Sequence, residues 1–329
     1  MPSFTVFKGH ESGLPKKHTI TKPDELTGDN VLVKVTASGL CGTGTPPLPN
    51  MVLGHEGVGI VKRLGPNTRH LQVGDRVAWG YETDSCGHCL ECLQGTETFC
   101  PERALYGASN LDQGSFASHG IWREAFLHVV PASLTDAEAA PLQCGGATMF
   151  SALQGVKPSD TVGILGVGGL GHLAIQFAAK MGCRVVVLSG SERKREEAMK
   201  LGAHEFVAMK DAKELQVGAK LNRLLVTAAV PPDWSLLLPV LAARSAIYPL
   251  SVAMGNFEIP YLSLILQGIT VVGSLVATRS VHREMLEFAA LHQIKPIVET
   301  YPMTEEGIAE AMEKLDKGQV YYRAVLVPQ

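Results

Sequence analysis

Two different hydrophobic patterns divide the chain. In residues 30–40, NVLVKVTASGL, apolar and polar side chains alternate, which is typical of a half-buried strand. The segments GHEGVGIVKRLG and LQVGDRVAW predict further short strands, with GPNTRH and GD as turns. Residues 1–140 therefore predict a β-rich domain in which glycine and proline separate short strands.

A strand–helix alternation begins near Pro158. The segment DTVGILGVGGLGHLAIQFAAKMGCRVVVLSG predicts a strand over 161–165, a helix from about residue 169 and a strand over 184–188. This order predicts a parallel sheet. From Ser280 onward the pattern predicts two helices and a final strand. The helix after residue 169 has an apolar face with a 3.6-residue period, formed by Leu170, Leu173, Ala174, Phe177, Ala178 and Met181.

Length and composition fit a globular protein of two domains. The chain has 329 residues, of which 46% are hydrophobic and 19% are charged. Its net charge of -3 offers no basic field for nucleic acid or anionic lipid. The N-terminus lacks the pattern of a signal peptide, and no uninterrupted apolar stretch reaches membrane-spanning length. We therefore expect a cytoplasmic protein with no nucleic-acid or membrane partner, in a compartment where stable disulfides are rare.

Four of the seven cysteines lie in one short segment, CGHCLECLQGTETFC. Cys86, Cys89, Cys92 and Cys100 have a spacing that suits tetrahedral zinc. Iron–sulfur ligation uses similar spacings, and free or disulfide-bonded cysteines are the remaining interpretation. Four thiolates would close the coordination of a zinc ion, so we expect a structural site in which His88 is surplus.

The turn after the strand over 161–165 carries a dinucleotide-binding motif. GVGGLG matches G-x-G-x-x-G, whose glycines permit a tight turn, close approach of a pyrophosphate and close helix packing. The helix N-terminus would add free N–H groups and positive potential. The candidate cofactor-binding residues here are Gly166, Val167, Gly168, Gly169, Leu170 and Gly171.

The end of the next strand favours NADP(H) over NAD(H). NAD enzymes place an acid there to bind the ribose 2′-hydroxyl, whereas this chain has Ser189, followed by Arg193 and Lys194. A carboxylate would repel a 2′-phosphate, while hydroxyls and cations attract it. The alternative is a solvated helix face whose basic residues pair with neighbouring glutamates.

Further residues of metal-binding type occur in three separated segments. Cys41 ends the strand over 30–40, His55 and Glu56 lie in VLGHEGVG, and Cys144 lies in APLQCGGATMF. Two cysteines and one histidine can hold zinc with the fourth position open, where the ion acts as a Lewis acid on a carbonyl. Each residue could instead be a packed side chain or part of a turn, because sequence separation alone does not bring them together.

The ordered set of motifs resembles the zinc-dependent medium-chain dehydrogenase/reductase superfamily, and within it the cinnamyl-alcohol-dehydrogenase-like branch. The resemblance runs nearly end to end through GLCGT, GHEGVGIV, VGDRVAW, the four-cysteine segment, APLQCGGATMFSAL, GVGGLGHLAIQFAAKMG and GSLVATR. It implies an α/β fold with a GroES-like β-rich catalytic domain over 1–145, completed by 278–329. It also implies a doubly wound Rossmann NADP-binding domain with a parallel sheet over 146–277.

The resemblance also implies an activity and its residues. Catalytic zinc would be held by Cys41, His55 and Cys144, with Glu56 as an occasional or outer ligand, and a second, structural zinc by the four clustered cysteines. The implied enzyme is an NADP(H)-dependent alcohol dehydrogenase or aldehyde reductase. It would transfer hydride directly between NADPH and a zinc-bound carbonyl of an aromatic or bulky aldehyde. Thr43 would begin its proton relay.

In this branch an S-x-S-x-x-K pattern reads the 2′-phosphate, and Ser189, Ser191 and Lys194 match it. Cys183 matches no functional position and is expected to be buried. Outside the glycine motif, the candidate NADP(H)-binding residues are Ser189, Ser191, Arg193, Lys194, Thr227 and Ser274.

The segment after Cys41 departs from the family pattern. Relatives usually continue CGT with aspartate and carry a relay histidine two residues further on, whereas Gly44 and Pro46 occupy these positions here. We therefore expect the proton to travel from Thr43 through water, the ribose hydroxyl or Thr45.

The short segment between Cys41 and His55 predicts a wide substrate cleft. Trp79 and Trp122 are candidates for its walls, with a core position favoured for Trp122. The altered relay leaves open a reductase of iminium or activated C=C bonds, and also a non-catalytic NADPH-binding subunit or sensor. The segment 269–277, ITVVGSLVA, is the expected edge of a homodimer, with an ordinary internal strand as the alternative.

Overall fold

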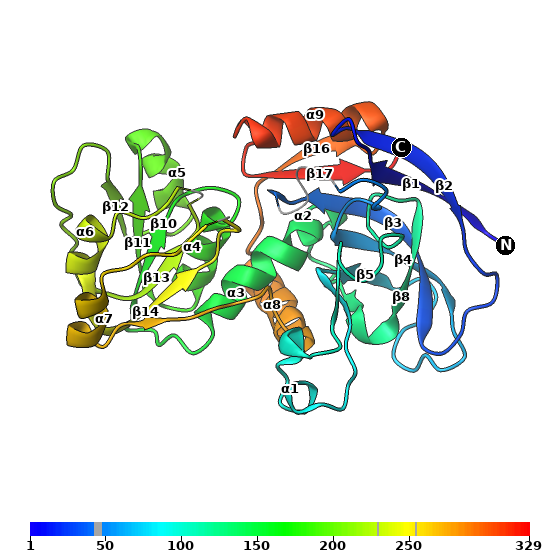
Figure 1. Cartoon of the computed structure of the whole chain (residues 1–329), viewed down its shortest axis with the longest axis horizontal. Coiled ribbons are helices and arrows are strands. Elements are labelled where there is room, and N and C mark those ends of the chain that lie inside the picture. The colour runs from blue at the N-terminus through cyan, green and yellow to red at the C-terminus, as the bar shows by residue number, and fades with distance from the viewer. Residues whose placement is uncertain (43–47, 229, 254) are drawn as a thin grey trace. The chain divides into compact units, whose positions relative to one another are not determined.

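The computed structural model describes residues 1–42, 48–228, 230–253 and 255–329. It divides into two compact units (Figure 1). Unit 1 comprises Met1–Ala147 and Val276–Gln329, and unit 2 is Thr148–Leu275. Unit 1 contains a mixed sheet and unit 2 a parallel sheet, which confirms the predicted α/β fold class.

A seven-stranded sheet forms the centre of unit 1, in the order β16-β17-β3-β4-β5-β9, with β8 also paired to β3. Its two longest strands, β3 (Asn30–Leu40) and β4 (Glu56–Leu64), pair antiparallel, so that Gly39 lies opposite Glu56. Because the C-terminal segment supplies β16 and β17, the last residues of the chain pair beside β3. The other strands are β5 (Arg76–Trp79), β8 (His119–Arg123), β9 (His128–Val129), β16 (Val298–Pro302) and β17 (Arg323–Val327).

Among its described residues, two small two-stranded sheets and four α-helices complete unit 1. The long helix α9 lies across β16 and β17 (Figure 1). The two-stranded sheets are β1 (Ser3–Gly9) with β2 (Pro15–Thr21), and β6 (Glu82–Asp84) with β7 (Ala104–Leu105). The helices are α1 (Leu90–Leu93), α2 (Asp136–Pro141), α8 (Arg279–His292) and α9 (Glu305–Asp316).

The strand predicted over 30–40 is β3, and the C-terminal pattern of two helices and a strand is α8, α9 and β17; these predictions are confirmed. The sequence pattern missed β16. Only Tyr301 of its five residues is buried, so β16 carries no clear alternation, and its pairing with β17 defines it.

Trp79 and Trp122 are core residues. The core position favoured for Trp122 is confirmed, and the hypothesis that Trp79 lines a substrate cleft is wrong. Their side chains are 0% and 1% exposed, and their ring centroids lie 4.9 Å apart. Gly57 faces Trp79 across β4 and β5, and a Cβ atom at Gly57 would lie 2.1 Å from the indole ring. The strand pairing therefore directs both rings into the interior of unit 1.

Unit 2 is built on a six-stranded sheet in the order β12-β11-β10-β13-β14-β15, with every pair parallel. The order reverses between β10 and β13, which is the switch point at which doubly wound sheets bind dinucleotides. The strands are β10 (Thr161–Leu165), β11 (Arg184–Ser189), β12 (Glu205–Ala208), β13 (Leu221–Val226), β14 (Leu241–Pro249) and β15 (Thr270–Val271).

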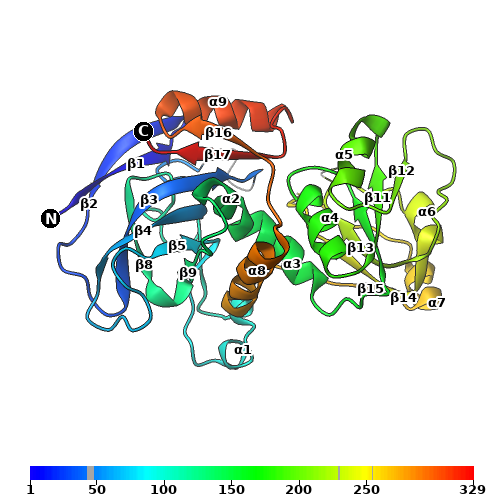
Figure 2. The same cartoon turned by 180° about the vertical axis from the view of Figure 1, so that it is seen from behind.

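Short helices connect these strands. Helix α4 packs on β10 and β11, and α5 packs on β12 (Figure 2). The predicted strands at β10 and β11 are confirmed, whereas only Thr270 and Val271 of the strand predicted over 269–277 pair in the sheet. The helices are α3 (Ala147–Leu153), which begins at the boundary of the units, α4 (Gly171–Lys180), α5 (Arg195–Lys200), α6 (Trp234–Leu237) and α7 (Tyr261–Gln267).

Within the described residues, no helix has both the length and the hydropathy needed to cross a membrane.

Candidate metal centres and nucleotide site

Unit 1 brings together the four residues that the sequence offered as a catalytic metal set. Cys41 follows β3, His55 precedes β4, Glu56 begins β4, and Cys144 follows α2. Each contributes one potential ligand atom, and these atoms all lie within 4.8 Å of one another. The sulfurs of Cys41 and Cys144 are 3.9 Å apart. Segments separated by about a hundred residues thus converge on one point.

The backbone around Cys144 is unusual. After α2 the chain forms a π-helical turn over Leu142–Gly146 before it continues into α3. Such turns are rare and concentrate at functional sites. Cys144 occupies the middle of this turn and is 9% exposed, so the turn presents its sulfur to the cluster while keeping it nearly buried.

The Glu56 carboxylate forms a buried ion pair with Arg323 of β17. The side chains of Glu56 and Arg323 are 0% and 7% exposed. One guanidinium nitrogen of Arg323 donates to both carboxylate oxygens, at 2.6 Å for Oε2. The sequence analysis missed Arg323, because its partner lies 267 residues away and no local pattern marks it.

Aromatic rings enclose His55. Its ring centroid lies 5.3 Å from that of Tyr81 and 4.9 Å from that of Tyr106. Burial raises the pKa of Tyr81, and the negative charge of Cys144 and Cys41 raises it further. Neither tyrosine was predicted from the sequence, because no motif includes them. Only their tertiary contacts identify them as neighbours of His55.

Charge at this cluster favours thiolate. The hydrogen bond from Cys144 lowers the pKa of Cys41 well below its usual range, and the same contact raises the pKa of Cys144. Burial disfavours the imidazolium form of His55, but the Cys41 thiolate outweighs burial and raises the His55 pKa. Of the two thiols, Cys41 is therefore the one favoured as thiolate, the form that binds a metal cation.

These donors fit zinc. Two sulfurs and one imidazole are the donor types that zinc prefers. His55 is 2% exposed, and its Nε2 atom has no hydrogen-bond partner among the described residues, although buried polar atoms normally have one. A metal ion would give that nitrogen a partner. Thr43, like Gly44, Thr45 and Pro46, lies outside the described residues.

The second cysteine cluster is also assembled. The ligand atoms of Cys86, Cys89, Cys92 and Cys100 lie within 4.8 Å of one another, with Cys86 Sγ 3.9 Å from Cys92 Sγ and 3.6 Å from Cys100 Sγ. Backbone N–H groups of His88 and Cys89 donate to the Cys86 sulfur and lower its pKa to about 6, which favours the thiolate that binds metal. All seven cysteines lie in the described residues, and none forms a disulfide.

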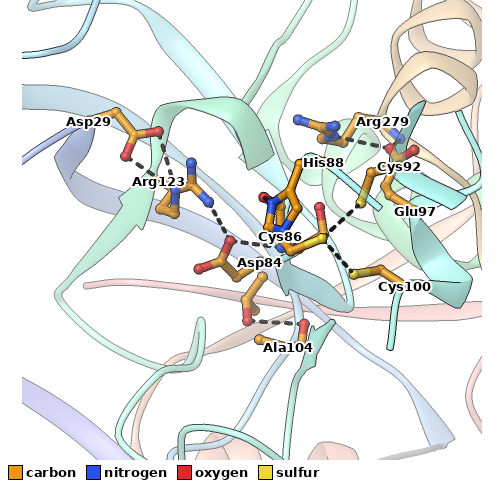
Figure 3. Close-up of polar contacts among 12 residues, drawn as sticks. Asp29, Asp84, Cys86, His88, Cys92, Glu97, Cys100, Ala104, Arg123 and Arg279 are labelled. Atoms are coloured by element: carbon orange, nitrogen blue, oxygen red, sulfur yellow. Dashed lines mark hydrogen bonds and ion pairs between the residues drawn. The ribbon is translucent and has the colours of Figure 1, made fainter. Parts of the chain in front are cut away.

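Two ion-pair contacts attach this lobe to the rest of unit 1 (Figure 3). Arg123 of β8 contacts both Asp84, just before the first cysteine, and Asp29, just before β3. Glu97, which is only 3% exposed, accepts hydrogen bonds from the backbone N–H and Nε of Arg279 at the start of α8. The lobe is therefore held at both ends of its cysteine segment.

The glycine turn of unit 2 has the geometry of a phosphate cradle. Gly166 adopts φ 101°, and a Cβ atom at Gly171 would lie 2.0 Å from the Gly166 carbonyl oxygen. At Gly168, by contrast, a Cβ atom would meet no described atom within 4 Å. The open position at Gly168 is where a pyrophosphate could approach the backbone. Thr227, directly after β13, donates its hydroxyl to the carbonyls of Leu165 and Gly166.

The residues expected to read a 2′-phosphate follow β11. Ser189 ends this strand, and Ser191 and Arg193 are exposed beyond it. Lys194 reaches back to the glycine turn, where its Nζ donates to the Val167 carbonyl at 2.8 Å. Ser274 is half-buried in the segment after β15. Lys194 therefore places a cation beside the glycine turn, and Ser189 places a hydroxyl at the end of the strand that pairs with β10.

Comparison with known proteins finds relatives over nearly the whole chain. Residues 27–132 match the alcohol dehydrogenase GroES-like domain, and residues 169–291 match the zinc-binding dehydrogenase family. An alcohol dehydrogenase of Geobacillus stearothermophilus is 35% identical, across 93% of this chain and 94% of that protein. The 1,2-dihydrovomilenine reductase of Rauvolfia serpentina is 36% identical, across 91% and 87%. A solved cinnamyl alcohol dehydrogenase from Sorghum bicolor superposes with a TM-score of 0.89 at 30% identity, covering 99% and 97% of the two chains.

Proposed function

We propose that this chain, which belongs to the zinc-dependent medium-chain dehydrogenase/reductase superfamily and to its cinnamyl-alcohol-dehydrogenase-like branch, is an NADP(H)-dependent alcohol dehydrogenase and aldehyde reductase. The observation that carries the proposal is the convergence of Cys41, His55, Glu56 and Cys144, with a buried imidazole nitrogen that lacks a partner among the described residues. A subunit that only bound nucleotide would not need such a cluster.

In this proposal Cys41, His55 and Cys144 hold the catalytic zinc. When bound, zinc polarises a carbonyl as a Lewis acid, and the nicotinamide exchanges hydride with the carbonyl carbon. Arg323 holds the Glu56 carboxylate beside the ligands. Tyr81 and Tyr106 pack against His55, and the half-buried Tyr81 would offer an aromatic ring to an aromatic substrate.

The second proposed zinc stabilises the four-cysteine lobe. Four thiolates close its coordination, so this ion folds the lobe and takes no part in the reaction. Asp84 and Glu97 form ion pairs with Arg123 of β8 and Arg279 of α8, so a folded lobe also fixes its position against these two elements. Free thiols of this number suit a reducing compartment, and we place the enzyme in the cytoplasm.

The proposed cofactor preference is for NADP(H). The hydroxyl of Ser189 at the end of β11 and Lys194 beside the glycine turn support it. When bound, the 2′-phosphate would meet hydroxyl and cationic groups, which favour it electrostatically.

The proton step is assigned to Thr43, with water, the ribose hydroxyl or Thr45 as the next carrier. Substitution of Thr43 by valine keeps the side-chain shape but removes the hydroxyl. We expect aldehyde reduction to fall by at least about tenfold. Full activity of Thr43→Val would remove this residue from the pathway.

The decisive experiment measures metal content and NADPH oxidation on the same purified protein. We expect two zinc ions per chain, one for each cluster, and oxidation of NADPH with cinnamaldehyde or benzaldehyde that is lost when the metal is chelated. Cys144→Ser should retain one zinc and lose turnover. Equal metal content and turnover in the variant would contradict the catalytic assignment.

A second candidate is reduction of iminium or activated C=C bonds. Gly44 and Pro46 replace the usual relay positions, and one relative is named as 1,2-dihydrovomilenine reductase. Turnover confined to imines or enones would favour this activity, and NADPH binding without any turnover would favour a sensor.

The proposed partner is a second copy of the same chain. Strand β15 is the last strand of the unit 2 sheet among the described residues, and the nearby helix α7 exposes Tyr261, Leu262 and Leu266, which are 77%, 67% and 80% exposed. Such an apolar surface beside an open strand edge suits pairing of two sheets. We expect sedimentation to give a dimer and Leu262→Glu/Leu266→Glu to give a monomer.

A further inference from the structure

A second set of metal-binding side chains surrounds Cys86. The potential ligand atoms of Cys86, His88 and Glu102 lie within 4.8 Å of one another. His88 and Glu102 are exposed, whereas Cys86 is half-buried and also belongs to the four-cysteine cluster. Figure 3 shows the His88 ring beside Cys86. One sulfur is therefore shared by an inner set of four thiols and an outer set at the surface.

The His88 ring is held in an orientation that suits metal binding. Its Nδ1 lies 2.9 Å from the Cys86 carbonyl oxygen. A carbonyl oxygen can only accept, so Nδ1 carries the proton and the neutral ring keeps its lone pair on Nε2. Histidines that bind metal commonly donate their other N–H to a backbone carbonyl in this manner.

The two sets differ in access to solvent. In the inner set Cys100 is 0% exposed and the other three cysteines are half-buried. An ion from solvent meets His88 and Glu102 at the surface, together with the accessible side of Cys86. Imidazole, carboxylate and thiolate are all zinc ligands, but a set of three donors with one thiolate binds less tightly than four thiolates and releases the ion faster.

We propose that Cys86, His88 and Glu102 form an entry site for zinc. The ion binds this outer set first and then passes to the inner set while its bond to Cys86 is kept. His88 and Glu102 are exchanged for Cys89, Cys92 and Cys100, whose thiols lose three protons to the solvent; nothing is oxidised or reduced. The inference rests on the proposed assignment of zinc to the four-cysteine lobe.

The test follows uptake of Co²⁺ by the metal-free full chain after rapid mixing, using thiolate-to-cobalt charge-transfer absorbance. All proteins carry Cys41→Ser and Cys144→Ser, which remove the thiolate signal of the other cluster. The test variant is His88→Ala/Glu102→Gln. The matched control is His10→Ala/Glu11→Gln, which makes the same changes at exposed residues between β1 and β2.

The parent should show an early phase with one thiolate per cobalt, followed by the four-thiolate spectrum. The test variant should lose the early phase and reach the same final amplitude about tenfold more slowly, while the control behaves as the parent. An unchanged rate, an equal slowing of the control, or a reduced final amplitude would each overturn the entry site. Absence of the four-thiolate spectrum in the parent would instead overturn the lobe assignment itself.

Discussion

A Cβ atom on residue 39 would lie 1.9 Å from Oε2 of Glu56. Gly39 and Glu56 are directly opposed on β3 and β4, and the Glu56 carboxylate occupies the space that a side chain at residue 39 would need. From there it meets Arg323. Because Gly39 has no side chain, the Glu56 carboxylate fits in this space and forms its buried ion pair beside the proposed catalytic zinc ligands.

Gly39→Ala should therefore displace the Glu56 carboxylate. Forcing a methyl group into a packed site should lower the free energy of unfolding by about 1–3 kcal/mol. A displaced Glu56 carboxylate beside the proposed zinc ligands should also lower kcat/KM by roughly tenfold or more. Calorimetry and steady-state kinetics measure the two effects. Gly42→Ala is the stability control, since a Cβ atom there meets no described atom within 4 Å; equal destabilisation of both variants would contradict the steric argument.

Arg323→Met should leave the buried Glu56 carboxyl group without its ion-pair partner. Breaking a buried ion pair by removing one partner costs about 3–5 kcal/mol, whereas removing both charges costs much less. The double variant Arg323→Met/Glu56→Gln should therefore be more stable than Arg323→Met alone. Denaturant unfolding of the parent, both single variants and the double variant measures the coupling. A double variant no more stable than Arg323→Met would show that Arg323 and Glu56 are not coupled.

Acid should destabilise unit 1 through two stacked histidines. His128 of β9 and His282 of α8 are buried with their ring planes 5° apart and their centroids 4.7 Å apart. Burial lowers the pKa of His282 to about 4, against the attraction of Glu97. Burial also lowers the pKa of His128, and the charges of His282, Arg283 and Arg279 lower it further.

The unfolded chain protonates histidine near pH ~6.5, and the folded chain protonates His282 only near pH 4. The stability contributed by neutral His282 is therefore complete above pH ~6.5 and falls as the pH falls toward 4. At about pH 5 the loss from His282 alone should be roughly 2 kcal/mol. His282→Phe should flatten this part of the pH dependence in urea unfolding at about pH 7.5 and pH 5. Parallel curves for parent and variant would refute it.

Ser189→Asp should shift cofactor preference toward NADH. A carboxylate at the end of β11 would repel a 2′-phosphate and accept hydrogen bonds from the ribose hydroxyls. We expect the ratio of kcat/KM for NADPH to that for NADH to fall by at least about tenfold. Ser189→Ala removes the hydroxyl without adding charge and should change the ratio less. An unchanged ratio in Ser189→Asp would count against the NADP(H) assignment.

Local sequence was enough to predict an element or a site wherever the interacting residues are close along the chain. The strand, glycine turn and helix from Thr161 to Lys180 follow one another directly, so periodicity and glycine placement predicted them. The segment from Cys86 to Cys100 is similar, because short loops can bring its sulfurs together. The resemblance to a known family extended this to Cys41, His55 and Cys144, which spacing alone could not join.

The sequence by itself therefore determined the α/β fold class, the glycine turn and the candidate donor residues, since each depends on residue type and local order. Only the tertiary structure decided that Trp79 and Trp122 belong to the core, that Arg323 pairs with Glu56, and that two tyrosines enclose His55. These relationships arise from strand pairing and burial between distant segments. The local sequence pattern around a residue does not show which distant residue its side chain contacts.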